Sequence, residues 1–132
     1  MRSIGIAERS LQLMLLRITD PQKVAFGKQL YEHGTVVANV ARSRMEIEQA
    51  RLLVLTAALQ IDKVRAKGAM KEIGMAKATV PTVVGQIIDR AMQVYGAEGI
   101  CQDQPLAAAF AGMRTLRYAD VRFSLSASVD RR

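Results

Sequence analysis

The sequence predicts an all-α fold, an antiparallel four-helix bundle followed by a short non-helical tail. Apolar residues recur at spacings of three and four through four segments, which places them on one face of a helix. The breaks between these segments are short and contain proline or glycine, as expected for antiparallel neighbours. The chain has 132 residues, half of them hydrophobic, which is enough for one domain with its own core. We therefore expect a bundle over residues 1–120 and a divergent tail over residues 121–132.

The first helix is predicted to run from the N-terminus to the Asp20-Pro21 step. Proline has no backbone N–H and disfavours helical geometry in the residue before it, so the helix should end there. Its buried face is predicted to contain Ile4, Ala7, Leu11, Met14, Leu15 and Ile18. The arginines and serines between these residues are also typical of targeting peptides, but Glu8 argues against that interpretation. We interpret the segment as a core helix.

The second and third helices are predicted from longer apolar stripes. The second should run from about Phe26 to Lys63, and the segment from Arg65 to Gly68 should break the helix. Its stripe is expected to contain Val36, Val40, Ile47, Ala50, Val54, Ala58 and Ile61. The third helix should contain Pro81, which is expected to kink it, and should bury Met70, Ile73, Val80, Val84, Ile87, Ala91 and Val94.

A fourth helix is predicted after a turn around Gly96 and Gly99. The Asp103 carboxylate should cap it by accepting backbone N–H groups, and Pro105 suits its first turn. The expected buried face contains Leu106, Ala109, Phe110, Met113 and Leu116. From Val121 to Val129 the apolar residues alternate with arginine and serine, a period of two that is not helical. The tail is therefore expected to differ from the bundle.

Composition and charge exclude several classes of protein. The net charge is +7, but the basic residues are dispersed, with Arg42 and Arg44 four residues before Glu46 and Glu48. That pattern indicates a solvated helix face rather than a nucleic-acid surface. A single cysteine, Cys101, excludes an internal disulfide and is expected to be an inert thiol in a loop. With one histidine, His33, no metal site is expected, and no apolar run reaches the length of a membrane span.

Three segments indicate a family. Lys23-Val-Ala-Phe-Gly27, Gln93-Val-Tyr-Gly-Ala97 and Arg117-Tyr-Ala-Asp120 together resemble the C-terminal helical domain of flavin-dependent acyl-CoA dehydrogenases. The stretch from Gly96 to Ala107 is most similar to acyl-CoA dehydrogenase family members ten and eleven. The resemblance covers residues 1–120. The Gly-Pro-Asp-Glu-Val-His stretch that follows the position of Asp120 in the family is absent, so we hypothesise that the tail reflects an alternative transcript or a misplaced exon boundary.

The resemblance implies α,β-dehydrogenation of an acyl-CoA substrate to a trans-2-enoyl-CoA with FAD as cofactor. Asp120 occupies the position of the catalytic base, which removes the α proton in the family. A dry site would raise the pKa of this carboxylate toward the working pH, as general-base catalysis prefers. The alternative is that Asp120 only ends a helix. The missing Gly-Pro leaves both interpretations open, because the direction of the chain after Asp120 decides where the carboxylate points.

The resemblance also implies two groups of cofactor-binding residues. Lys23 replaces an arginine that reaches the flavin pyrophosphate, so it keeps the charge but loses the planar fork. Phe26 packs near the cofactor in the family, although a core position is equally compatible with its sequence. The second group approaches the adenine end of FAD held by a neighbouring subunit: Gln93, Val94, Tyr95, Gly96 and Ala97. Taken without the flanking motif, Gly96 and Gly99 would indicate only the end of a helix.

The family further implies a homo-oligomer, a tetramer with these bundles at its centre, and electron transfer flavoprotein or another electron acceptor as partner. A mitochondrial or peroxisomal location is implied, although the chain carries no clear targeting signal. Family enzymes also contain an N-terminal helical domain and a central β domain, so we expect this fragment to be inactive alone. The alternative function is a non-enzymatic helical interaction module derived from the same domain, which keeps the subunit interface without the chemistry.

Overall fold

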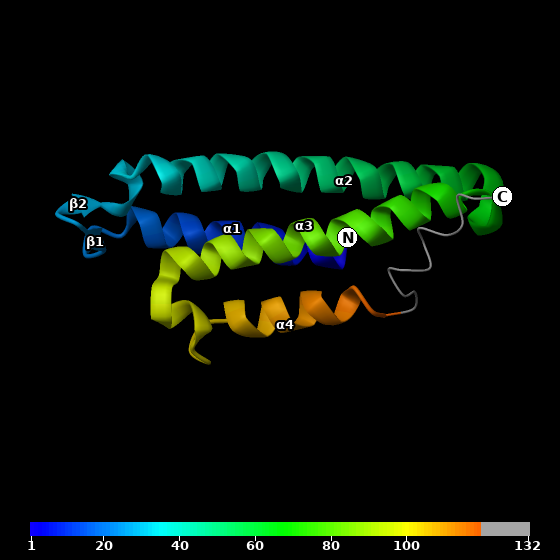
Figure 1. The fold of residues 1–132 in the computed structure, drawn as a ribbon. Helices are drawn as coiled ribbons and strands as arrows, with labels where there is room; N and C mark the ends of the chain where they lie inside the picture. The colour runs from blue at the N-terminus through cyan, green and yellow to red at the C-terminus, as the bar shows by residue number, and fades with distance from the viewer. Residues whose placement is uncertain (120–132) are drawn as a thin grey trace.

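The computed structural model describes residues 1–119 and contains four α-helices in that range. Successive helices run in opposite directions, with α2 and α4 on the two outer sides and α1 and α3 between them (Figure 1). The predicted all-α bundle is therefore confirmed. In chain order the elements are α1 (Arg2–Thr19), β1 (Val24–Ala25), β2 (Lys28–Gln29), the 3₁₀ helix η1 (Leu30–Glu32), α2 (Gly34–Gly68), α3 (Met70–Tyr95), the 3₁₀ helix η2 (Gly96–Ile100) and α4 (Leu106–Leu116).

Helix α3 is the centre of the core, because each of the other three helices packs more extensively against α3 than against any other helix. Aliphatic and methionine side chains from every helix meet around it, in keeping with a sequence that contains no tryptophan. Each fully buried side chain of this size contributes about 1.5–3 kcal/mol relative to an exposed one. The largest of them are Leu11, Met14, Ile47, Ile87, Ile88, Leu106 and Met113. The chain stays helical across the buried Pro81.

The predicted bounds of the first helix are confirmed, since α1 ends at Thr19 directly before Asp20-Pro21. Five of its six predicted core residues are buried, but Leu15 is 40% exposed, so that part of the prediction was wrong. The buried stripe extends toward Ser10 and Leu13 instead. Leu15 consequently lies at the edge of the stripe, where only part of a side chain is covered.

The predicted start of the second helix at Phe26 was wrong. Residues 24–29 form a small antiparallel hairpin in which Val24 pairs with Gln29. Its two-residue loop, Phe26 and Gly27, has positive φ angles of 51° and 75°. Two consecutive positive φ values are the requirement of a type I′ hairpin turn and cannot continue a right-handed helix. Helix α2 therefore begins only after η1, at Gly34.

The second half of α2 is more exposed than predicted. Ala58 and Ile61 are exposed, whereas Ala57 is buried. This half of α2 runs beyond the N-terminal end of α1 (Figure 1), so α1 does not cover it. The predicted break is confirmed at Arg65, where a φ of 65° and a ψ of 167° interrupt the helical geometry.

The fourth helix begins later than predicted. Pro105 occupies the N-cap position of α4 without a side-chain cap, so the predicted capping by Asp103 was wrong. Leu106 and Met113 are buried as expected, but Phe110 is 39% exposed and, on α3, Met70 is 62% exposed. Phe110 lines a groove between α3 and α4, and Met70 is the first residue of α3. Within residues 1–119, none of the helices combines the length and apolar content that crossing a bilayer requires.

Candidate cofactor site

The two predicted cofactor-binding segments lie at the same end of the bundle. Lys23 and the hairpin with Phe26 at its tip follow α1, and the loop that begins at Gly96 follows α3 (Figure 1). The antiparallel topology produces this arrangement, because the C-terminal ends of α1 and α3 face the same way. The last turn of α1 lies next to the loop, since Arg17 contacts Tyr95 and Glu98.

The hairpin presents an aromatic ring to solvent. Phe26 is 100% exposed, so the interpretation of this residue as part of the core was wrong. A φ of 51° is uncommon for a bulky non-glycine residue and stores backbone strain. Lys23 lies at the start of the same hairpin and is half-buried. The chain therefore holds an exposed phenylalanine at an unfavourable backbone angle, close in sequence to a cation.

His33 and Glu32 support the hairpin from η1 and the start of α2. The His33 ring packs edge-on to Phe26 with 6.5 Å between ring centroids. Its Nε2 lies 3.0 Å from the carbonyl oxygen of Ala25 and donates to it in the tautomer that carries the proton there. The backbone N–H of Gln29 donates to the Glu32 carboxylate at 2.8 Å. Sequence reasoning had assigned no role to His33.

The loop after α3 depends on two glycines. Gly96 adopts a φ of 65° and a ψ of −139°, a combination that side-chain-bearing residues avoid. A Cβ atom on Gly99 would lie 2.6 Å from the carbonyl oxygen of Met92, so only glycine fits against the end of α3. Both glycines are therefore required for the loop geometry, and Gly96 and Ala97 are exposed.

Tyr95 belongs to the core rather than to an open surface. Its side chain is buried, and its hydroxyl donates to the carbonyl oxygen of Leu13 at 3.1 Å. Burial raises the pKa of the Tyr95 phenol above its ordinary value of 10.0. Of the predicted group, Gln93, Gly96 and Ala97 are exposed and Val94 is half-buried. A ligand at this surface would meet the side chain of Gln93 and the main chain of the loop.

A cluster around Arg17 connects the end of α1 to this loop. No local sequence pattern predicts it, because its members are far apart in the chain. The Arg17 guanidinium donates to Glu98 at 2.7 Å and to the carbonyl oxygen of Tyr95 at 3.3 Å. Its central carbon lies 4.9 Å from the centroid of the Tyr95 ring. Gln104 donates to the other Glu98 oxygen at 2.9 Å. Arg17 is thus committed to the loop and is unavailable to replace Lys23.

Asp120, the predicted base, lies outside the described residues, as does the whole tail over residues 121–132. Their predicted roles stay predictions.

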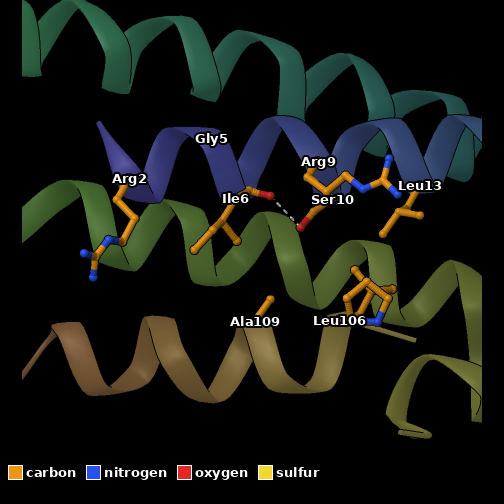
Figure 2. A pocket seen from close by; sticks show the side chains of 9 residues that line it. Arg2, Gly5, Ile6, Arg9, Ser10, Leu13, Leu106 and Ala109 are labelled. Atoms are coloured by element: carbon orange, nitrogen blue, oxygen red, sulfur yellow. Dashed lines mark hydrogen bonds between the residues drawn. The ribbon is translucent and has the colours of Figure 1, made fainter. Parts of the chain in front are cut away.

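Two grooves on the bundle contain none of the predicted cofactor-binding residues. The first separates α1 from α4 and has an apolar floor that includes Ile6, Leu13 and Leu106, with Arg2 and Arg9 beside it (Figure 2). The second lies between α3 and α4, where Phe110 and Pro81 meet Arg114, Arg117 and Asp89. The predicted cofactor-binding residues therefore lie outside both grooves.

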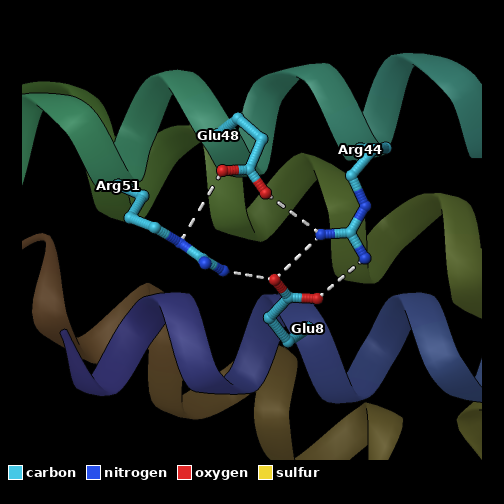
Figure 3. A network of polar contacts seen from close by, with 4 residues as sticks. All are labelled: Glu8, Arg44, Glu48 and Arg51. Atoms are coloured by element: carbon cyan, nitrogen blue, oxygen red, sulfur yellow. Dashed lines mark hydrogen bonds and ion pairs between the residues drawn. The ribbon is translucent and has the colours of Figure 1, made fainter.

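The charged residues between α1 and α2 form a surface network. Glu8 of α1 accepts hydrogen bonds from Arg44 and Arg51 of α2, and Arg44 also pairs with Glu48 at 3.3 Å (Figure 3). The Arg44 pairing with Glu48 is as predicted. Glu46, the predicted partner of Arg42, instead pairs with Arg90 of α3 at 2.6 Å. The hydrogen bond from Arg44 lowers the pKa of the Glu8 carboxyl below its ordinary value of 4.5.

Comparison with known proteins gives a consistent match. The family model of the acyl-CoA dehydrogenase C-terminal domain matches residues 1–120. Acyl-CoA dehydrogenase family member 11 of Rattus norvegicus is 52% identical over 120 residues, which are 91% of this chain and 15% of that protein. Family member 10 of Mus musculus is 51% identical over 120 residues, 91% of this chain and 11% of its own length. The chain thus spans less than a sixth of these relatives.

Solved structures agree in fold. A protein from Mycobacterium abscessus, described as an acyl-CoA dehydrogenase, superposes with a TM-score of 0.91 at 39% identity and covers 97% of this chain and 31% of its own. Butyryl-CoA dehydrogenase from Megasphaera elsdenii superposes with a TM-score of 0.84 at 24% identity, over 96% of this chain and 32% of its own. At this lower identity the likeness concerns the fold alone.

Proposed function

This chain belongs to the acyl-CoA dehydrogenase family through its C-terminal domain, and on that premise we propose that it supplies part of the FAD site and the base of an acyl-CoA dehydrogenase. The proposed reaction converts an acyl-CoA into a trans-2-enoyl-CoA. FAD, when bound, supplies the acceptor for the hydride that leaves the β carbon. The residues of this chain bind and orient the cofactor and take up the α proton.

The observation that carries the proposal is the hairpin tip. A fully exposed phenylalanine at a positive φ angle costs about 1–3 kcal/mol in a folded chain unless something else favours it. Single exposed hydrophobic side chains are common on protein surfaces, so the unfavourable φ angle at Phe26, and not its exposure alone, indicates a role. Contact of Phe26 with a cofactor held by a neighbouring subunit accounts for both the exposure and the strain.

The other residues fit a phosphate-bearing cofactor. Lys23 directly precedes the hairpin and offers a positive charge to a pyrophosphate, with three donors but without the bidentate fork of arginine. At the same end of the bundle, Gln93 offers a side-chain amide and Gly96 and Ala97 offer exposed main chain. We assign no direct contact to the Tyr95 side chain, because its ring and hydroxyl are already used in the core.

We propose Asp120 as the base that removes the α proton. The family resemblance alone supports this assignment. A site closed to water would raise the pKa of this carboxyl, since burial disfavours the charged form, and would bring it nearer to the pH at which a general base works best.

A flavin-binding measurement tests the proposal directly. The purified chain is mixed with FAD and desalted, and retained flavin is read from its visible absorbance. We expect retention that is weakened by Lys23→Ala and by Gly96→Val, while Tyr31→Ala, a change in η1 outside the proposed site, has no effect. Retention that all three substitutions leave unchanged contradicts the assigned site.

A chimaera tests the chemistry in a complete enzyme. Residues 1–120 of this chain replace the matching 120 residues of the rat relative, and turnover of acyl-CoA is followed with a dye or electron transfer flavoprotein as acceptor. We expect a flavin-containing, active chimaera in which Asp120→Asn lowers the rate by about 10²–10⁴-fold, the usual contribution of a general base. A chimaera that binds flavin and is unaffected by Asp120→Asn refutes the assignment of the base.

The outer face of α2 supports a homo-oligomer. Met45, Leu52 and Leu59 are 58–63% exposed and recur every seven residues, and Leu55 lies on the same stripe. Such a stripe on a long helix is typical of a helix–helix interface. We expect Leu52→Glu with Leu59→Glu to lower the mass measured by light scattering without unfolding the chain. The equally exposed Leu16→Glu on α1 serves as control, and a wild-type monomer contradicts the proposed interface.

The same stripe favours the alternative function, a helical interaction module without catalysis. The two functions differ in flavin binding. An oligomer that retains no FAD, and a chimaera without flavin, would support the interaction module. For the enzyme we further propose electron transfer flavoprotein or another acceptor as electron partner, and a mitochondrial or peroxisomal location, which imaging of the tagged full-length protein tests.

A further inference from the structure

Arg17 joins the end of α1, which the hairpin follows, to the loop after α3. Lys23 and Phe26 follow α1, whereas Gln93 to Ala97 close α3, so their relative position depends on how these two helix ends are joined. Arg17 lies in the last turn of α1 and is 16% exposed. Its side chain contacts both Tyr95 and Glu98.

The chemistry of arginine suits this position. The planar guanidinium uses one nitrogen for the Glu98 carboxylate and the other for the Tyr95 carbonyl, and it lies over the Tyr95 ring. Lysine could pair with the carboxylate but could not make all three contacts in a fixed geometry. Because the Tyr95 carbonyl directly precedes Gly96, the contact holds the main chain at the point where it leaves the helix. Gln104 binds Glu98 from the far side of the loop.

We propose that Arg17 is a positioning residue that sets the hairpin and the loop at the spacing that FAD requires. This inference rests on the proposed function, because it presumes that both segments contact one cofactor. Arg17 itself binds no cofactor; it acts through Glu98 and the Tyr95 carbonyl.

A second ion pair provides a matched control. Arg90 of α3 pairs with Glu46 of α2 at 2.6 Å, and its side chain is 15% exposed. It also has a neutral partner, the Ser43 hydroxyl at 3.2 Å. Arg90→Gln and Arg17→Gln therefore remove similar half-buried pairs between helices, and both should lower the melting temperature. Only Arg17→Gln should affect the cofactor site.

Geometry can be measured without FAD. Cys101 is the single cysteine of the chain and is exposed next to the loop, so a nitroxide spin label can be attached there without further substitutions. Paramagnetic broadening of the amide signals of residues 23–29 then reports the position of the hairpin relative to the loop. We expect Arg17→Gln to change this pattern and Arg90→Gln to preserve it. Glu98→Gln tests the same contact from the loop and replaces Arg17→Gln if that variant does not fold.

Flavin affinity is measured on the same variants. We expect Arg17→Gln to weaken FAD binding about tenfold, the effect of losing one well-placed contact. Arg17→Lys should recover part of the lost affinity. Arg90→Gln should bind FAD as tightly as the wild type. If Arg17→Gln and Arg90→Gln give the same broadening pattern and the same affinity, the inference is wrong. If neither the wild-type chain nor the chimaera retains FAD, the proposed function fails. An unchanged broadening pattern in Arg17→Gln would then overturn the positioning role as well.

Discussion

Replacing Tyr95 by phenylalanine isolates one buried hydrogen bond between α3 and α1. The hydroxyl donates to the Leu13 carbonyl at 3.1 Å in an otherwise aliphatic environment. Leu13 lies inside α1, so its carbonyl keeps the helical hydrogen bond from four residues later and is not left without a donor. The loss should therefore be that of a neutral hydrogen bond, about 0.5–1.5 kcal/mol. For a domain of this size, about 1 kcal/mol lowers the melting temperature by about 3–5 °C.

The dependence on pH separates this hydrogen bond from a simple change in packing. Because burial raises the pKa of Tyr95 above 10.0, its neutral form stabilises the fold below that pH. This contribution is lost as the pH rises above 10.0, where the unfolded phenol ionises more easily. The measurement is thermal unfolding followed by circular dichroism at pH 7 and at pH 10–11, with the half-exposed Tyr31→Phe as control. The difference in melting temperature between wild type and Tyr95→Phe should become smaller at high pH. A difference that is absent at pH 7, or that does not change with pH, would refute the reasoning.

Three further predictions concern stability and acid sensitivity. Gly99→Ala should lower the melting temperature, because its Cβ would lie 2.6 Å from the Met92 carbonyl oxygen. Gly74→Ala, in open space on α3, should instead raise stability by about 0.5–1 kcal/mol. Phe26→Asn should relieve the positive φ and stabilise the chain by roughly 1 kcal/mol while FAD retention falls; a loss of stability would show that the ring is needed for folding. Because the pKa of Glu8 is lowered, its ion pairs stabilise the fold above pH 4.5, and this stabilisation is lost as the pH falls below that value. The free energy of unfolding of Glu8→Gln should therefore be lower than that of the wild type by roughly 0.2–1 kcal/mol at pH 7. In acid titrations the two free energies should become equal at low pH.

The helices that the sequence predicted best are those whose ends carry strong local signals. Asp20-Pro21 ends α1, and Gly96 ends α3, because each imposes a backbone geometry that a helix cannot continue. The start of α2 was missed because Phe26 adopts a positive φ angle, which the identity of the residue does not predict. The apolar spacing there extended the helical pattern into a hairpin. Tertiary contacts with η1, not local propensity, hold this turn.

Burial in α2 shows where periodicity stops being informative. The stripe through Ile47 and Ala50 is buried because α1 and α3 cover it, but the same stripe at Ala58 and Ile61 is exposed. An apolar face indicates that something covers it and does not indicate what. The exposed half of α2 extends past α1, so the sequence could predict an apolar face there but not whether this chain or another one buries it.

The candidate site separates in the same way into a part that motifs predict and a part that only packing reveals. The motifs located Lys23, Phe26 and Gln93 on exposed segments at one end of the bundle, which local patterns can do. They also included Tyr95, whose side chain the fold uses to join α3 to α1, so a motif position does not establish which atoms of a residue are available. Arg17 carried no motif, yet it contacts the main chain at Tyr95 and the side chain that anchors the loop. If the cofactor spans both segments, its affinity should therefore depend on an ion pair that no cofactor atom touches.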